Sequence, residues 1–186
     1  MATPQSTPRF TYGDYVQWKG DERYELIDGV VHQMSPAPSR RHQELVTEIV
    51  HQIRSQIPRS SPCRAYASPF DVRLPSGDEP DAEVETVVQP DVVVVCDPVK
   101  LDDAGCRGAP DWVIEVSSPS SSVRDRVDKV ALYRRVGVRE YWLVDPTASS
   151  VSVWLDGREP AAEHPLDGVL EAQAVPVRID FGELRD

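Results

Sequence analysis

Two apolar runs decide the fold of this chain: QPDVVVV at residues 89–95 and WVIEV at residues 112–116. Both are rich in β-branched residues and lack polar alternation, which is typical of a strand covered on both faces. Asp91 stands at the start of the first run, and Glu115 interrupts the second. We therefore predict two central strands of one sheet, each with a carboxylate.

Helical signals lie on both sides of these strands. Residues 45–57 repeat apolar side chains at helical spacing between Ser39, a good N-cap residue, and Pro58. A second helix is predicted over residues 123–136, ended by Gly137. Its predicted apolar side consists of Val123, Val127, Val130 and Ala131.

The ends of the chain favour β-structure. Residues 24–27 and 30–34 flank Asp28-Gly29, a pair that suits the positive φ angles of a type I′ hairpin turn. Residues 141–144 and 151–155, separated by turn signals, predict a C-terminal β meander. The predicted fold is mixed α/β, a mixed central β-sheet flanked by helices, with a short capped helix after Thr11.

The composition indicates one domain. The 186 residues are 40% hydrophobic, and no run approaches the roughly 18 apolar residues that a membrane helix needs. We expect a disordered tail over residues 1–10, a single domain over residues 11–186, no membrane segment and a cytoplasmic location, because no secretory signal is visible. Cys63, Cys96 and Cys106 show no metal or disulfide pattern, and we expect buried or inert thiols.

The net charge of −11 is unevenly distributed. Residues 34–66 carry five basic and two acidic residues, and residues 121–141 carry six and three, whereas residues 67–120 carry three basic and twelve acidic residues. The acidic run over residues 75–85 predicts a solvated, mobile loop. This pattern excludes a general DNA-coating protein but is compatible with a local, metal-assisted phosphate site.

A carboxylate inside an apolar strand is costly unless it is paired or binds a cation, so Glu115 needs a partner. If the two strands are neighbours, Asp91 and Glu115 converge on one Mg²⁺, an ion that uses one or two protein carboxylates and completes its shell with water and substrate phosphate.

Several blocks together resemble a known family: YELIDG at residues 24–29, PD at residues 90–91, PDWVIEVSSPS at residues 110–120 and GVREYWLVDP at residues 137–146. Met34-Ser35-Pro36, His42, Asp125, Lys129 and Tyr133 agree with the same pattern. Over residues 11–179 the chain is similar to the Uma-two family of restriction-endonuclease-like proteins, within the PD-(D/E)XK nuclease superfamily.

The resemblance implies a restriction-endonuclease-like core and a Mg²⁺-dependent DNA endonuclease, with Mn²⁺ able to substitute. A homodimer is the expected assembly, because dimers are common in the superfamily and because the C-terminal block around Tyr141, Trp142 and Trp154 is aromatic and apolar. The resemblance makes Asp91 and Glu115 the acidic metal ligands. The superfamily lysine falls two residues after the second acid, where this chain has Ser117, and the family places the lysine on the following helix at Lys129. Ser117 and the acidic charge favour the alternative, a catalytically inactive nuclease-fold binding or regulatory protein.

For Lys129, Glu25 and His42 the sequence allows a second interpretation. Asp125 and Lys129 form an exposed i, i+4 pair in the alternative reading. Glu25 is either a third site carboxylate or a surface residue, and His42 either touches substrate or water or is a solvated helix-start residue.

Three further interpretations concern the serines, Asp111 and the arginines. The serines of residues 117–122 form no nucleophile elbow, so we expect them to cap the next helix. Asp111, four residues before Glu115, is expected to be a strand-entry residue. The expected phosphate contacts are Arg40, Arg41, Arg124, Arg126, Arg134 and Arg135.

Overall fold

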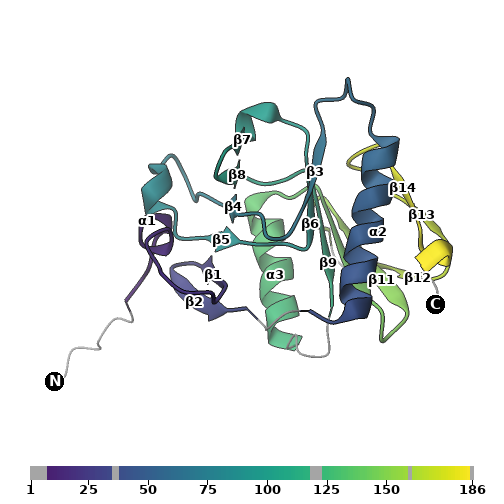
Figure 1. Cartoon of the computed structure of the whole chain (residues 1–186), viewed down its shortest axis with the longest axis horizontal. Coiled ribbons are helices and arrows are strands. Elements are labelled where there is room, and N and C mark those ends of the chain that lie inside the picture. Colours follow the sequence, from purple (N-terminus) through teal and green to yellow (C-terminus); the bar gives the residue numbers. More distant parts are fainter. Residues whose placement is uncertain (1–7, 35–37, 118–122, 159–160, 185–186) are drawn as a thin grey trace.

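The computed structural model describes residues 8–34, 38–117, 123–158 and 161–184. A main sheet lies between α2 (Arg40–Gln56) and α3 (Val123–Val136), and a second sheet packs on the α3 side (Figure 1). The mixed α/β class is confirmed. The two central strands share one sheet, as predicted, and the N-terminal hairpin belongs to a second sheet that the sequence did not indicate.

The main sheet has the order β12-β11-β10-β9-β6-β3. Its strands are β3 (Arg64–Ala67), β6 (Val92–Val95), β9 (Trp112–Val116), β10 (Glu140–Asp145), β11 (Ser150–Leu155) and β12 (Ala162–Pro165). The two predicted central strands are β6 and β9, which are antiparallel neighbours. α3 connects β9 to the parallel strand β10, and β10 to β12 form the predicted antiparallel meander.

The valine run of β6 serves two cores because successive side chains of a strand point to opposite faces. Val92 and Val94 pack in the cluster that contains Ile49 of α2. Val93 and Val95 pack in the cluster that contains Leu132 of α3. This double burial explains why the run shows no polar alternation.

The N-terminal sheet has the order β2-β1-β5-β4-β8-β7. Its strands are β1 (Tyr24–Ile27), β2 (Val30–Gln33), β4 (Val72–Arg73), β5 (Val87–Val88), β7 (Leu101–Asp102) and β8 (Gly105–Arg107). The remaining elements are α1 (Tyr12–Tyr15), the hairpin of β13 (Val169–Glu171) and β14 (Arg178–Asp180), and the 3₁₀ turns η1 (Asp81–Glu83), η2 (Pro98–Lys100) and η3 (Phe181–Leu184).

The predicted turn and cap residues are confirmed. Asp28 and Gly29 have φ angles of 50° and 75° between β1 and β2, as a type I′ turn requires. The Ser39 hydroxyl accepts a hydrogen bond from the His42 amide at the start of α2. Gly137 follows α3 with a φ of 83°.

The predicted apolar side of α3 is right at Val130, which packs against the core, and wrong at Val127 and Ala131. Leu132 and Tyr133 are buried, whereas Val127 is 60% exposed and Ala131 is exposed. The side chain of Val123 lies outside the described residues. The helix is rotated from the predicted orientation because its inner side carries Lys129 and Tyr133 toward a buried carboxylate.

The expectation of three inert thiols is also wrong. Cys63 and Cys96 form a disulfide, and Cys106 is free and buried, which raises the pKa of its thiol to about 11. Arg64 pairs with Val95 in the antiparallel register of β3 and β6, so Cys63 and Cys96, the next residues along these two strands, face each other. A sequence separation of 33 residues gives no sign of this proximity.

The acidic loop is held by hydrogen bonds and is not simply solvated. Asp81 bonds the buried guanidinium of Arg73, and Arg107 contacts the same carboxylate at 3.3 Å. Glu79 accepts hydrogen bonds from the amides of Ser76 and Gly77. The loop supplies counter-charge to a cation inside the N-terminal sheet.

Only the last residues of the predicted N-terminal tail, residues 8–10, are described by the structure. Residues 1–7 lie outside the described ranges, whereas the Phe10 amide donates to the Gly29 carbonyl at 2.9 Å and Arg9 pairs with Glu85. No helix in the described ranges combines the length and apolar character needed to cross a bilayer.

Candidate active site

The two acidic residues of the central strands meet at one end of the main sheet. The register Val92↔Ile114 places Asp91 opposite Glu115. The Val116 amide donates to Asp91 Oδ2 at 2.8 Å, and the Asp91 amide lies 3.4 Å from Glu115 Oε2. The antiparallel pairing therefore brings together two carboxylates that are 24 residues apart in the chain.

Lys129 reaches this end of the sheet from α3. Its Nζ lies 2.9 Å from Glu115 Oε1 and 3.1 Å from Oε1 of Glu25, which is on β1. The lysine side chain is 18% exposed, so the interpretation of an exposed pair with Asp125 is wrong for Lys129. The side chain of Asp125 lies outside the described residues. One ammonium thus joins the main sheet to the N-terminal sheet.

Ser117 occupies the position where the superfamily places its lysine. Its amide donates to the Val144 carbonyl at 2.8 Å, so the strand pairing of β9 with β10 continues through this residue. The other serines of the run, residues 118–122, lie outside the described ranges. The ammonium next to Glu115 comes from α3.

Tyr133 also lies in the site, although we did not predict it from the sequence as a site residue. Its hydroxyl donates to Glu115 Oε1 at 2.9 Å, and the side chain is buried. A signal was present, because Tyr133 follows Lys129 by four residues and the two share one helix face. Glu115 Oε1 is therefore held by two donors from consecutive turns of α3.

The electrostatics of the cluster oppose a fully ionised state. Burial, together with the neighbouring Asp91 and Glu25 carboxylates, raises the pKa of Glu115 to about 7, although Lys129 acts in the opposite direction. Burial also disfavours charge on Lys129, but Glu115 and Glu25 outweigh it and hold the pKa of the ammonium above its usual range. Lys129 contacts two of the three carboxylates, Glu115 and Glu25, and the negative charge of the cluster favours a cation.

His42 belongs to the cluster and is not a solvated helix-start residue. Its Nε2 lies 3.1 Å from Asp91 Oδ2, and its side chain is 10% exposed. The hydrogen bond to Asp91 raises the pKa of His42 above its usual value, against the effect of burial. Nδ1 is buried and has no hydrogen-bond partner among the described residues.

The donor set fits a magnesium-type ion better than a transition metal. In the described part of the chain, no three His, Cys, Asp or Glu side chains form a metal-binding group. Mg²⁺ needs only one or two carboxylates because water and phosphate complete its octahedron. Oδ1 of Asp91 accepts no hydrogen bond from the described residues, and Glu115 Oε2 has only the 3.4 Å contact with the Asp91 amide. These two oxygens are the ones left to hold an ion.

Gln89, which we did not predict as a site residue either, contacts Glu25 of the site. Its amide nitrogen in the main chain donates to Glu25 Oε1 at 2.8 Å, and its side chain donates to Tyr15 and to Asp71 Oδ1 at 2.9 and 2.7 Å. Arg23 donates to its side-chain oxygen. Gln89 thereby fixes the chain just before Pro90-Asp91 against the N-terminal sheet.

Asp111 is structural, as expected. Its Oδ2 accepts from the Cys96 amide at 2.7 Å, and its Oδ1 lies 3.1 Å from Arg139 Nη1. Both contacts tie the start of β9 to its surroundings.

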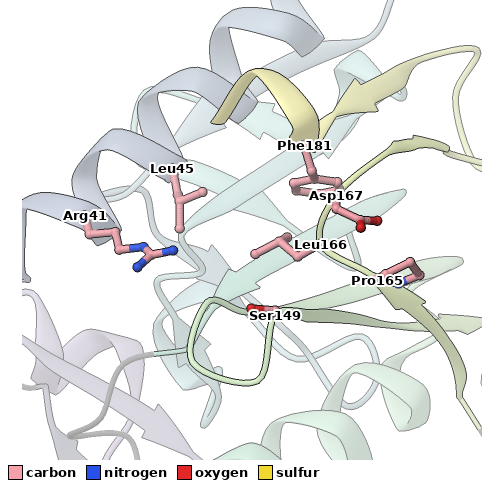
Figure 2. Close-up of a pocket in the computed structure, with 7 residues that line it drawn as sticks. All are labelled: Arg41, Leu45, Ser149, Pro165, Leu166, Asp167 and Phe181. Carbon is pink, nitrogen blue, oxygen red and sulfur yellow. The ribbon is translucent and has the colours of Figure 1, made fainter. Parts of the chain in front are cut away.

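The predicted phosphate-binding arginines have mixed settings. Arg40 pairs with Glu44, and Arg135 forms two hydrogen bonds with Asp28. Arg41 extends over a pocket of about 200 Å³ that Leu45 and other residues line (Figure 2). Arg134 has further interactions, and the side chains of Arg124 and Arg126 lie outside the described residues. The two arginines with carboxylate partners have their charge already compensated.

The fold is also present in a solved structure. A crystal structure from Anabaena variabilis, described as "a putative nuclease belonging to DUF820", superposes with a TM-score of 0.75 at 19% identity, covering 94% of this chain and 97% of that one. The chain therefore has a nuclease-like mixed α/β fold, with a cluster of acidic residues and a lysine at one end of its main sheet.

Sequence comparison identifies the family. Residues 12–180 match Uma2, the family described as "Putative restriction endonuclease", and the chain belongs to it. An uncharacterized protein from Synechocystis sp. is 24% identical over 150 residues, covering 79% of this chain and 74% of the relative.

Proposed function

We propose that this protein is a Mg²⁺-dependent endonuclease that hydrolyses phosphodiester bonds in DNA. Asp91 and Glu115 are the proposed metal ligands, and Mn²⁺ is expected to substitute. The observation that carries the proposal is the 2.9 Å contact between Lys129 Nζ and Glu115 Oε1, which supplies from α3 the ammonium that Ser117 lacks. Membership of the Uma2 family supports the same function.

The ion would polarise the scissile phosphate and lower the pKa of an attacking water. The chain's own residues have distinct proposed roles. Lys129 is held protonated by Glu115 and Glu25, so it acts by stabilising negative charge in the transition state and not as a general base. Glu25 orients Lys129, and Tyr133 orients Glu115.

His42 has a positioning role in this proposal. Its Nε2 faces Asp91 Oδ2, which leaves the other oxygen of Asp91 for the ion. The imidazole is enclosed, so it acts through Asp91 and not by direct contact with the substrate.

The test combines metal binding with cleavage. Calorimetric titration with Mg²⁺ and Mn²⁺ should show binding to the wild type, and single- or double-stranded DNA should be cleaved only when the metal is present. Asp91→Ala and Glu115→Ala should abolish both properties, because each removes a proposed metal ligand. The protein should stay folded after Glu115→Ala because Lys129 keeps its ion pair with Glu25, and circular dichroism checks the fold of both variants. Glu163→Ala, which removes an exposed carboxylate on β12, is the matched control and should behave as wild type.

Two outcomes would contradict the proposal. Metal binding without cleavage of either DNA form would favour the alternative, a nuclease-fold binding or regulatory protein. No metal binding by the wild type at millimolar Mg²⁺ and neutral pH would overturn the metal-dependent nuclease.

We also propose a homodimer, as the family resemblance implies. The aromatic C-terminal block does not support it directly, since Tyr141 and Trp142 are buried within the protomer and Trp154 stacks on Tyr141. Sedimentation across micromolar concentrations tests the assembly, and a monomer throughout would contradict it.

A further inference from the structure

A basic groove runs along the outer side of the edge strand β3. It has a volume of about 490 Å³, and the turn between α2 and β3, which projects at one end of the main sheet, forms part of its wall (Figure 1). Three arginines line it, Arg54 on α2, Arg59 in the turn and Arg64 on β3, together with Tyr66. We propose that this groove binds the sugar–phosphate backbone of DNA outside the candidate active site. The inference rests on the proposed function in taking DNA as the ligand.

The charge of this segment is opposite to that of the whole chain. Residues 49–70 contain three arginines and one histidine but no aspartate or glutamate, in a protein with 31 acidic residues and a net charge of −11. A cationic strip on a protein of net negative charge attracts a polyanion, because the acidic parts of the chain repel it.

Two of the groove arginines, Arg54 and Arg64, are held by neutral groups. Arg54 Nε and Nη2 donate to the Ala65 carbonyl at 3.1 and 2.8 Å. Arg64 Nη1 donates to the carbonyls of Ser61 and Cys63 at 2.5 and 2.8 Å. Such bonds fix the guanidinium groups but leave their charge uncompensated, and guanidinium groups suit phosphate oxygens.

No carboxylate of the described residues lies within ion-pair distance of the three groove arginines, in contrast to Arg40 and Arg135. Asp97 follows Cys96, the disulfide partner of Cys63, and its Oδ1 accepts from the Val99 amide at 3.0 Å. The groove therefore has positive charge available for an anion.

Strand β3 connects the groove with the candidate active site. Ala67 pairs with Val92, and the Ser68 amide donates to the Asp91 carbonyl at 3.0 Å, so Ser68 lies level with the site. Arg64 is four positions away, or roughly 13 Å at about 3.3 Å per residue. A DNA strand rises about 3.4 Å per nucleotide, so on a strand that runs parallel to β3 the groove would contact phosphates roughly four nucleotides from the phosphodiester bond at the candidate active site.

Fluorescence anisotropy with a short labelled DNA duplex tests the groove. Binding is measured in EDTA, so that no cleavage occurs, and over a series of salt concentrations. The double variant Arg59→Ala/Arg64→Ala should bind about 10-fold or more weakly than wild type, and the slope of log K against log salt should fall in magnitude by about 1.8, or 0.9 for each lost phosphate contact. Arg54 is left intact because it joins α2 to β3.

Two control variants separate charge from structure. Lys19→Ala/Arg158→Ala removes the same number of exposed cations outside the groove and should bind almost as wild type. Arg59→Lys/Arg64→Lys keeps the charge and should keep the salt slope. The proposal is overturned if the alanine variant binds like the Lys19/Arg158 control, or if the lysine variant loses as much affinity as the alanine variant.

The result is independent of catalysis. If groove variants lose DNA binding but the wild type cleaves no DNA with Mg²⁺, the groove stands and the nuclease proposal fails. If the wild type cleaves DNA and its binding is indifferent to Arg59 and Arg64, the groove fails and the nuclease proposal stands.

Discussion

Lys129 Nζ lies 2.9 Å from Glu115 Oε1, although the two residues belong to different elements, α3 and β9. The helix thus places a cation beside the acidic residue of the strand that precedes it. The proposed nuclease chemistry rests on this contact, in which α3 supplies an ammonium beside Glu115 and residue 117 is a serine.

Replacing the lysine should separate catalysis from metal binding. Lys129→Ala should lower DNA cleavage by about 10²-fold or more, the usual effect of losing one group that stabilises a transition state, while Mg²⁺ affinity changes little. The protein should remain folded, because Glu115, whose pKa burial raises to about 7, can hold a proton in place of the ion pair. Single-turnover cleavage and metal titration measure the two effects, with Lys19→Ala as the control.

A second-site lysine should restore part of the lost activity. Ser117 is two positions after Glu115, so its side chain points to the same face of the strand. We expect Ser117→Lys in the Lys129→Ala background to recover cleavage, whereas Ser117→Met should not. Equal cleavage by the Ser117→Lys and Ser117→Met variants would show that an ammonium at position 117 does not replace that of Lys129.

Arg73 should be a large contributor to stability. It is 2% exposed, and its guanidinium bonds both Asp81 and Asp102. Arg73→Ala should lower the free energy of unfolding by about 2–5 kcal/mol, because it opens a void in place of a large buried side chain, while Asp81 and Asp102 stay partly hydrated. Arg107→Ala, at a partly exposed position that also contacts Asp81, should cost at most about 1 kcal/mol. Urea unfolding measures both, and equal small losses would contradict the role of Arg73.

The ion pair of Asp28 with Arg135 should give a small pH-dependent stability. Hydrogen bonds from Arg135 hold the pKa of Asp28 below its usual range. Because the folded-state pKa is lowered, the contribution is present above the usual pKa and is lost as the pH falls through the lowered value. Both side chains are about half exposed, so the effect should stay below about 1 kcal/mol and shrink in high salt.

Urea unfolding of wild type and Arg135→Ala at pH 7 and at pH 2 measures this contribution. The difference between the two proteins should be present at pH 7 and absent at pH 2. A difference that is independent of pH would contradict the ion pair as its source.

Local features were predictable from sequence because they depend on neighbouring residues alone. The hairpin turn at Asp28-Gly29 needs positive φ angles that these residues adopt at low cost, and Ser39 caps α2 through a residue three positions away. The valines of β6 identify a doubly buried strand, and Asp91 and Glu115 stand out as carboxylates at or within such strands. The fold class and the central pair of acids were therefore available from the sequence itself.

Only the tertiary structure decided which distant groups share one environment. The Cys63–Cys96 bond, the separate N-terminal sheet and the contact of Glu25 with Lys129 each depend on the pairing of strands or on the rotation of a helix about its axis. Helical periodicity alone misplaced Val127 and Ala131, because the inner side of α3 carries Lys129 and Tyr133 to the buried Glu115. Contacts between residues far apart in the chain produce no periodic pattern in the sequence, so only the tertiary structure shows them.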